Sequence, residues 1–184
     1  MRALVVYESM YGNTRTVAID IAAGLRATHE VTVVPVTRAS RELVAAADLI
    51  IAGSPTHMHG MPTVTSRRSA AGTASRPGSG LILDPDADGP GMRAWLAGLD
   101  AESVPAASFD TRLSGIPALT GRASRVIARL LRGRGCRLVI PPESFLVSSK
   151  NTLLPGEAAR ARAWGALIGE TADVAPVAGP RSFG

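Results

Sequence analysis

Hydroxyl and amide side chains gather in a short glycine-containing loop near the start of the chain. The loop consists of Ser9, Met10, Tyr11, Gly12, Asn13 and Thr14. If a helix begins here, its first backbone amides have no partner within the helix, and the helix dipole favours negative charge beside them. Side-chain donors and a glycine that allows close backbone approach would complete such a site. The residue types therefore favour phosphate binding, although helix capping alone would also explain them.

Two well-known phosphate-binding motifs are absent from this loop. It lacks the GxGxxG fingerprint of dinucleotide-binding folds and the GK[ST] ending of nucleoside-triphosphatase loops. No GxSxG elbow occurs elsewhere, and no serine or cysteine nucleophile has a base marked in the sequence. Hydrolysis is therefore not indicated.

The segments on either side of the loop are predicted to position it between a strand and a helix. Residues 3–7 form an apolar run typical of a strand buried on both faces, and apolar residues recur every four positions from Val17 to Leu25. Further strand-like runs lie at 31–36 and 48–52, and Pro35 predicts that the first of these is an edge strand or ends there. The resulting β-α-β-α-β alternation predicts a parallel sheet with right-handed crossovers.

The second half of the chain continues the alternation of strands and helices. A fourth strand is predicted over 104–109, and a fifth over 138–147 with an interruption at Pro141-Pro142. Helices are predicted over 92–99, over 121–134 and from Pro155 onward. The pattern predicts the α/β class, as a doubly wound five-stranded parallel sheet in the order 2-1-3-4-5 with helices on both faces.

One domain is predicted over residues 1–171, followed by a tail over 172–184 that is rich in Pro, Gly, Ala and Ser. Residues 62–91 are predicted to be an irregular insertion. The part over 63–80 is rich in Ser, Thr, Arg, Ala and Gly, and no regular structure is predicted for it. It is interpreted either as a flexible surface insertion or as a lid that orders over a ligand.

The segment Tyr7–Thr14 resembles the loop around the FMN phosphate in the flavodoxin family. Two later segments, Gly53–Gly60 and Ser108–Arg112, follow in the order of that family's flavin-ring loops. The resemblance spans roughly residues 1–170. It implies that the loop over 9–14 holds the phosphate of FMN. It also implies that the flavin ring is framed by Pro55, Thr56, His57, Met58, His59, Gly60, Asp110, Thr111 and Arg112.

The resemblance implies an FMN protein that transfers electrons to a redox partner protein or a small-molecule acceptor. An NAD(P)H-dependent quinone or flavin reductase is an alternative within the same site, and a flavin-free domain that binds a protein partner is another. Members of the family commonly stack an aromatic side chain on each ring face, whereas this chain has His57 to His59 and Asp110 to Arg112 in those loops. Because acidic relatives have low potentials, Arg112 and the positive net charge lead us to expect a less negative potential here.

Composition and charge limit the remaining classes of function. The chain has 184 residues, a formal net charge of +5, and no apolar run long enough to span a membrane. Its basic side chains are scattered and its aromatic residues few, so nucleic-acid binding is not expected. Cys136 is the only cysteine, which excludes a disulfide framework and, with an N-terminus unlike a signal peptide, favours the cytoplasm. No metal site is expected, because His57-x-His59 lacks a third ligand and Asp84–Gly89 only begins like a calcium loop.

Overall fold

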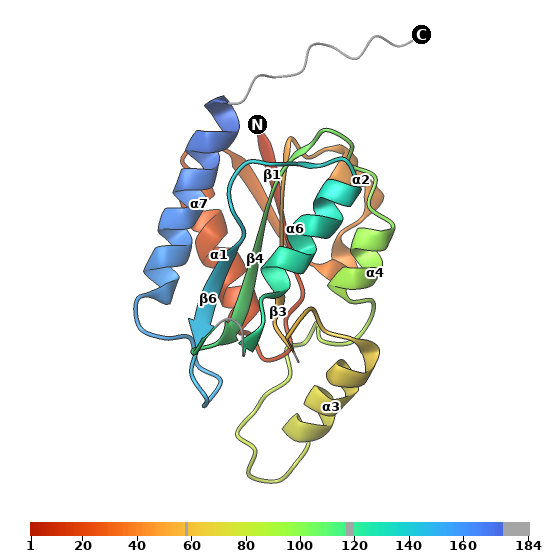
Figure 1. Ribbon diagram of the computed structural model, residues 1–184, viewed down its shortest axis with the longest axis vertical. Coiled ribbons are helices and arrows are strands. Elements are labelled where there is room, and N and C mark those ends of the chain that lie inside the picture. Colours follow the sequence, from red (N-terminus) through yellow and green to blue (C-terminus); the bar gives the residue numbers. More distant parts are fainter. Residues whose placement is uncertain (58, 117–119, 175–184) are drawn as a thin grey trace.

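A parallel sheet forms the centre of the protein (Figure 1). The computed structural model describes residues 1–57, 59–116 and 120–174. The strands are β1 Arg2–Tyr7, β2 Glu30–Pro35, β3 Leu49–Pro55, β4 Pro105–Leu113, β5 Arg137–Leu138 and β6 Glu143–Val147. The helices are α1 Asn13–Leu25, the 3₁₀ helix η1 Val36–Arg38, α2 Arg41–Ala45, α3 Val64–Ala74, α4 Met92–Ala97, α6 Ala123–Gly133 and α7 Glu157–Val174.

The strand order confirms the predicted doubly wound topology. The sheet runs β2-β1-β3-β4-β5, and β6 also pairs with β4. β5 lies beside the start of β4 and β6 beside its later half, both in parallel. The predicted fifth strand is therefore divided at Pro141-Pro142, where proline has no amide to donate to the ladder. β2 is the opposite edge and ends at Pro35, as expected.

Helices cover both faces of the sheet (Figure 1). On one face α1 and α7 pack over the apolar side chains of β1, β3 and β4, together with the aromatic residues Phe109, Phe145 and Trp164. The three rings meet edge to face, with centroids 6.0 to 6.5 Å apart. On the other face α2, α4 and α6 bury the alternate residues of the same strands.

Small residues let α1 and α7 approach until their backbones almost touch. A Cβ atom placed on Gly165 would lie 2.1 Å from the carbonyl oxygen of Ile21, and one on Gly24 would lie 2.0 Å from that of Arg162. Only glycine fits at both positions. The close contact fixes α1, and therefore the loop that precedes it, against the C-terminal helix.

The prediction that residues 63–80 lack regular structure was wrong for α3. Thr63 caps this helix: its hydroxyl accepts from the Ser66 amide, and the Ser66 hydroxyl accepts from the Thr63 amide. The helix could not be predicted from periodicity, because its Ser, Thr, Arg and Ala residues form no apolar stripe. Only Ser66 and Ala70 are buried within it. Further support comes from distant segments: Tyr11 of the loop after β1 donates to Ala70 O, and Arg67 donates to the carbonyl groups of Ala87 and Gly89. A local sequence pattern does not reveal these contacts.

The C-terminal helix continues to Val174 and so includes the first three residues of the predicted tail, and residues 175–184 lie outside the described residues. Among the described residues, no helix combines the length and apolar character needed to cross a bilayer.

Candidate functional site

The loop between β1 and α1 has the backbone form of an anion-binding turn. Gly12 lies at φ 91° as the residue before the helix, a conformation that favours glycine. Its amide donates to Ser9 Oγ at 3.1 Å. The amides of Tyr11, Asn13 and Thr14 have no acceptor within the described residues. Three donors at the positive end of α1 are thus left for a ligand or solvent.

Two side chains of the loop join it to later parts of the chain. Thr14 Oγ1 and Thr111 Oγ1 are 2.7 Å apart, which ties the start of α1 to β4. Asn13 Nδ2 donates to the carbonyl oxygen of Asn151 at 2.9 Å and to its Oδ1 at 3.1 Å. Asn151 lies in the loop after β6, in the left-handed conformation. The carboxyl ends of β1, β4 and β6 therefore meet at one rim of the sheet.

A cleft of about 210 Å³ opens at this rim. It is lined by Met10, Tyr11, Asn13, Thr14, Pro55, Thr56, His57, Thr111, Arg112, Leu113, Val147 and Asn151. All three predicted segments contribute to it. Leu113, Val147 and Asn151 were not predicted. The rule that ligands bind beyond the carboxyl ends of parallel strands could have indicated Asn151, because it follows the fifth strand.

Several predicted residues do not line the cleft. Ser9 is buried and accepts the Gly12 amide, while His59, Gly60 and Asp110 are not among the lining residues. Met58 lies outside the described residues. Asp110 points to the opposite face of β4 from Thr111, because successive side chains alternate along a strand. Its Oδ2 accepts from the amide of Ser124 at 2.7 Å, so it caps α6, and burial raises the pKa of Asp110.

The loop after β3 forms a narrow turn beside the cleft. The His57 amide donates to Gly60 O at 2.8 Å, and the Gly60 amide donates back to His57 O at 3.0 Å. His59 takes a left-handed φ of 72° and packs on Gly121, where a Cβ atom would lie 2.2 Å from the His59 Cα. Burial lowers the pKa of His57, so its ring lines the cleft in the neutral form at pH 7.

Arg112 brings a largely buried positive charge to the cleft. Its Nη1 donates to Leu113 O at 3.1 Å, to Gly115 O at 3.1 Å and to Thr120 Oγ1 at 3.0 Å. Its Nε is buried with no hydrogen-bond partner. The guanidinium therefore holds the segment after β4 in place and keeps one donor that no described group satisfies.

The insertion packs against the back of the loop between β1 and α1. Tyr11 donates through its hydroxyl to Ala70 O at 2.9 Å, and the Asp84 amide donates to Met10 O at 2.8 Å. Glu8, at the end of β1, accepts from the Met92 amide at 2.8 Å and lies 3.5 Å from Arg67 Nε. Burial raises the pKa of Glu8. The residues of the insertion are thus part of the support of the loop.

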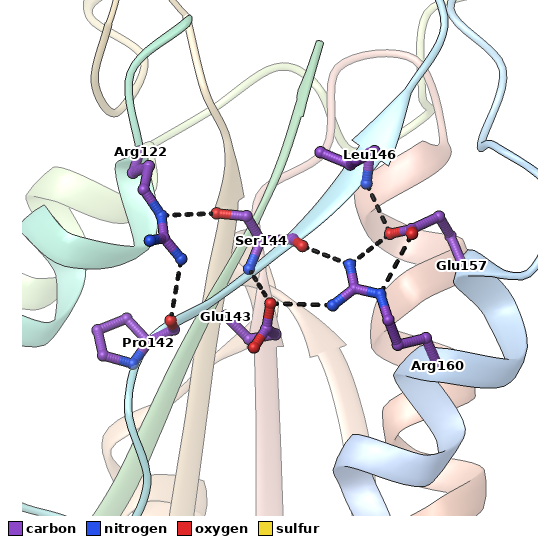
Figure 2. A network of polar contacts seen from close by, with 7 residues as sticks. All are labelled: Arg122, Pro142, Glu143, Ser144, Leu146, Glu157 and Arg160. Carbon is purple, nitrogen blue, oxygen red and sulfur yellow. Dashed lines mark hydrogen bonds and ion pairs between the residues drawn. The ribbon is translucent and has the colours of Figure 1, made fainter. Parts of the chain in front are cut away.

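A polar network at the sheet edge positions the other wall of the cleft (Figure 2). Figure 2 shows Arg160 of α7 meeting Glu143, Ser144 and Glu157, while Glu157 also accepts from the Leu146 amide at 2.7 Å. Arg122 donates to Ser144 Oγ from the start of α6. These bonds satisfy the backbone groups of Ser144 and Leu146 at the outer edge of β6, beside which the described residues form no further strand. The network therefore fixes the strand that ends in Val147.

Among the described residues, no group of three or more His, Cys, Asp or Glu side chains could hold a metal ion. Cys136 is a buried free thiol. The acidic turn at 84–89 is instead organised locally, with the Asp86 amide donating to Asp84 Oδ1 at 3.2 Å.

The family profile described as flavodoxin matches residues 5–111 of the chain. That match contains the loop over 9–14, the turn after β3 and β4 as far as Thr111. The chain belongs to the flavodoxin family. Flavodoxins bind a flavin and transfer electrons to redox partner proteins, and this chain has their fold. No curated protein sequence matches the chain.

Solved flavodoxin structures have the same fold. A flavodoxin from the domain Archaea superposes with a TM-score of 0.66 at 20% identity, covering 94% of this chain and 99% of that one. Flavodoxin 1 from Bacillus cereus gives a TM-score of 0.64 at 20% identity, covering 92% and 98%. The flavodiiron protein from Giardia intestinalis gives a TM-score of 0.61 at 21% identity. That match covers 94% of this chain but only 36% of the flavodiiron protein. The chain thus matches the two flavodoxins over nearly their whole length.

Proposed function

We propose that this protein binds FMN in the cleft at the strand rim and works as an electron carrier. The observation that carries the proposal is the set of amides of Tyr11, Asn13 and Thr14 at the start of α1, with no acceptor among the described residues. A phosphate group supplies the oxygen acceptors that these donors lack. Bound FMN would supply the redox chemistry by taking up and releasing electrons.

The donor set and the cleft fit a phosphate attached to a flat, mainly apolar ring. Gly12 gives the loop its curvature, and Asn13 and Thr14 are held by Asn151 and Thr111. Met10, the neutral His57, Leu113 and Val147 offer apolar or uncharged surface for the ring. Arg112 adds a positive charge to the lining of the cleft.

The proposal is tested by comparing FMN with riboflavin, which lacks the phosphate. Titration of the flavin-free protein, followed by flavin fluorescence and visible absorption, is expected to show much tighter binding of FMN. Gly12→Ala should lower FMN affinity about tenfold or more and leave riboflavin binding nearly unchanged, because alanine is strained at φ 91°. Gly78→Ala is the matched control, since Gly78 has φ 77° and no atom within 4 Å of an added Cβ.

The outcomes separate the proposal from its alternatives. Equal affinity for FMN and riboflavin would overturn the assignment of the phosphate loop. A protein that takes up neither flavin would instead be a flavin-free partner-binding domain. Steady oxidation of NADPH by the FMN-loaded protein with a quinone acceptor would make it a reductase, whereas a carrier needs a separate reductase. The cytoplasmic location stays a prediction.

A further inference from the structure

The outer face of α6 carries a row of arginines. Arg125, Arg129 and Arg132 are all exposed, whereas Ile127, Ala128 and Leu131 on the inner face are buried. The spacings of four and three residues place the three side chains on one side of the helix. With a rise of about 1.5 Å per residue, the row is about 10 Å long. We call Arg125, Arg129 and Arg132 the arginine row.

No ion pair neutralises the arginine row within the described residues. By contrast, Arg15, Arg67, Arg160 and Arg162 each lie within 4 Å of a carboxylate. Like charges at these spacings destabilise a helix by a few tenths of a kcal/mol, and Arg125 lies in the first turn, where the helix dipole disfavours positive charge. Helix stability therefore does not explain the row.

The arginine row begins beside the cleft. The Ala123 amide at the start of α6 donates at 3.0 Å to the hydroxyl of Thr56, which lines the cleft. Arg125 lies two residues further along. Figure 1 shows α6 running from the rim where the strands end toward the other end of the sheet. A molecule seated on the row would thus lie next to the cleft opening.

We propose that the arginine row is the docking surface for an acidic redox protein, an inference that rests on the proposed function. Guanidinium groups pair with carboxylates through two parallel hydrogen bonds, and a row of them steers an acidic surface toward itself. Electron transfer requires the partner to be close to the cofactor, and the row adjoins the cleft. A nucleic acid fits less well, because no aromatic side chain of the described residues is exposed for base stacking.

The test measures electron transfer from a reduced acidic plant-type [2Fe–2S] ferredoxin to the FMN-loaded protein by stopped flow. One electron leaves the iron–sulfur cluster, which becomes oxidised, and enters the flavin. The second-order rate constant should fall at least about tenfold between 20 mM and 500 mM salt, because screening removes the attraction. Arg125→Glu combined with Arg129→Glu should lower the low-salt rate constant at least about tenfold and abolish or invert its salt dependence.

Two further variants keep the result interpretable. Arg2→Glu combined with Arg26→Glu changes the net charge equally at the far end of the sheet and should alter the rate constant less than about twofold. Arg125→Gln combined with Arg129→Gln should give a smaller loss in the same direction, and it replaces the glutamate pair if that pair does not fold. Equal effects of the near and far pairs, or no salt dependence, would overturn the proposal.

Two further measurements separate a protein partner from a nucleic acid, and docking from FMN binding. Fluorescence anisotropy with a 20-nucleotide RNA at 150 mM salt should show no binding that depends on the arginine row. Binding that R125E/R129E removes and R2E/R26E retains would overturn a protein partner in favour of nucleic acid. Ferredoxin binding to the flavin-free protein, measured by calorimetry, keeps the test independent of FMN, since the arginine row needs no cofactor. Loss of binding in R125E/R129E there supports docking even if FMN binding fails.

Discussion

Arg112 is the one lining residue of the cleft that is charged at neutral pH among the described residues. A buried positive charge near a flavin favours the addition of negative charge to the ring when it is reduced. Arg112→Gln is therefore expected to make the two-electron potential of bound FMN more negative by on the order of 50 mV. This corresponds to about 1 kcal/mol for each electron. Redox titration of both proteins measures the shift.

Arg112 also holds Leu113 and Gly115 through its hydrogen bonds, so its charge and its structural contacts have to be separated. Arg112→Lys keeps the charge and loses the planar set of donors. The lysine variant should retain most of the wild-type potential. If the lysine and glutamine variants shift it equally, the hydrogen bonds rather than the charge determine it.

Asp110 makes stability depend on pH. Because burial raises the pKa of Asp110 in the folded state, the folded protein keeps this proton at pH values where the unfolded chain has lost it. Its contribution is therefore most favourable at low pH and is lost as pH rises from the ordinary value of the carboxyl through the raised one. Asp110→Asn can still accept from the Ser124 amide but does not titrate.

The Tm of D110N relative to wild type should therefore increase between pH 4.5 and pH 8, measured by thermal unfolding monitored by circular dichroism. Taking the difference removes the contributions of the other titrating groups. A relative Tm that decreases over this range would mean that attraction to Arg122 and capping of α6 outweigh the cost of burying the charge.

At the scale of elements, the packing of α7 on α1 limits which residues this helix pair accepts. Gly165→Ala would place a methyl group 2.1 Å from the Ile21 carbonyl oxygen, so the helices must separate. We expect a loss of about 2 kcal/mol in the free energy of unfolding, despite the better helix propensity of alanine. Urea unfolding followed by circular dichroism gives the value.

Gly72→Ala in α3 is the same chemical change at an exposed helical position with nothing within 4 Å of the added Cβ. It should stabilise the protein by roughly 0.5–1 kcal/mol, because alanine loses less backbone entropy than glycine on folding. If G165A lowers the free energy of unfolding and G72A raises it, contact between α1 and α7 is the cause of the loss in G165A. A destabilised G72A would show that α3 has a neighbour on that side.

For the whole molecule, ligand binding at the rim should appear as added stability, because the loops that form the cleft come from β1, β3, β4 and β6. At an FMN concentration about one hundred times its Kd, the folded state gains about 2.7 kcal/mol. For a chain of this length, Tm should rise by roughly 5–10 °C. Thermal unfolding with FMN, and with riboflavin at the same concentration, measures the effect. An equal rise in Tm with FMN and with riboflavin would show that the phosphate does not contribute to binding.

The parts of the site that could be predicted are those in which local chemistry and chain order are sufficient. Apolar runs of strand length predicted the strands, of which the fifth is divided into β5 and β6. The four-residue spacing of apolar residues predicted the helix after Asn13. The order of the segments placed Ser9–Thr14, Pro55–His57 and Thr111–Arg112 at one rim, because parallel strands end on the same side. Asp110 was grouped with them by proximity in sequence, although strand alternation turns its side chain to α6.

Local pattern by itself determined the layered α/β scaffold of this protein and the hydroxyl-rich turn after its first strand, because periodicity and turn chemistry act between near neighbours. Tertiary structure alone decided which groups complete the cleft. Asn151 reaches Asn13 across 138 positions of the chain, α3 is stabilised by contact with Tyr11, and α7 closes the β6 edge through Arg160. Such contacts depend on how distant segments pack, and no short stretch of sequence contains that information.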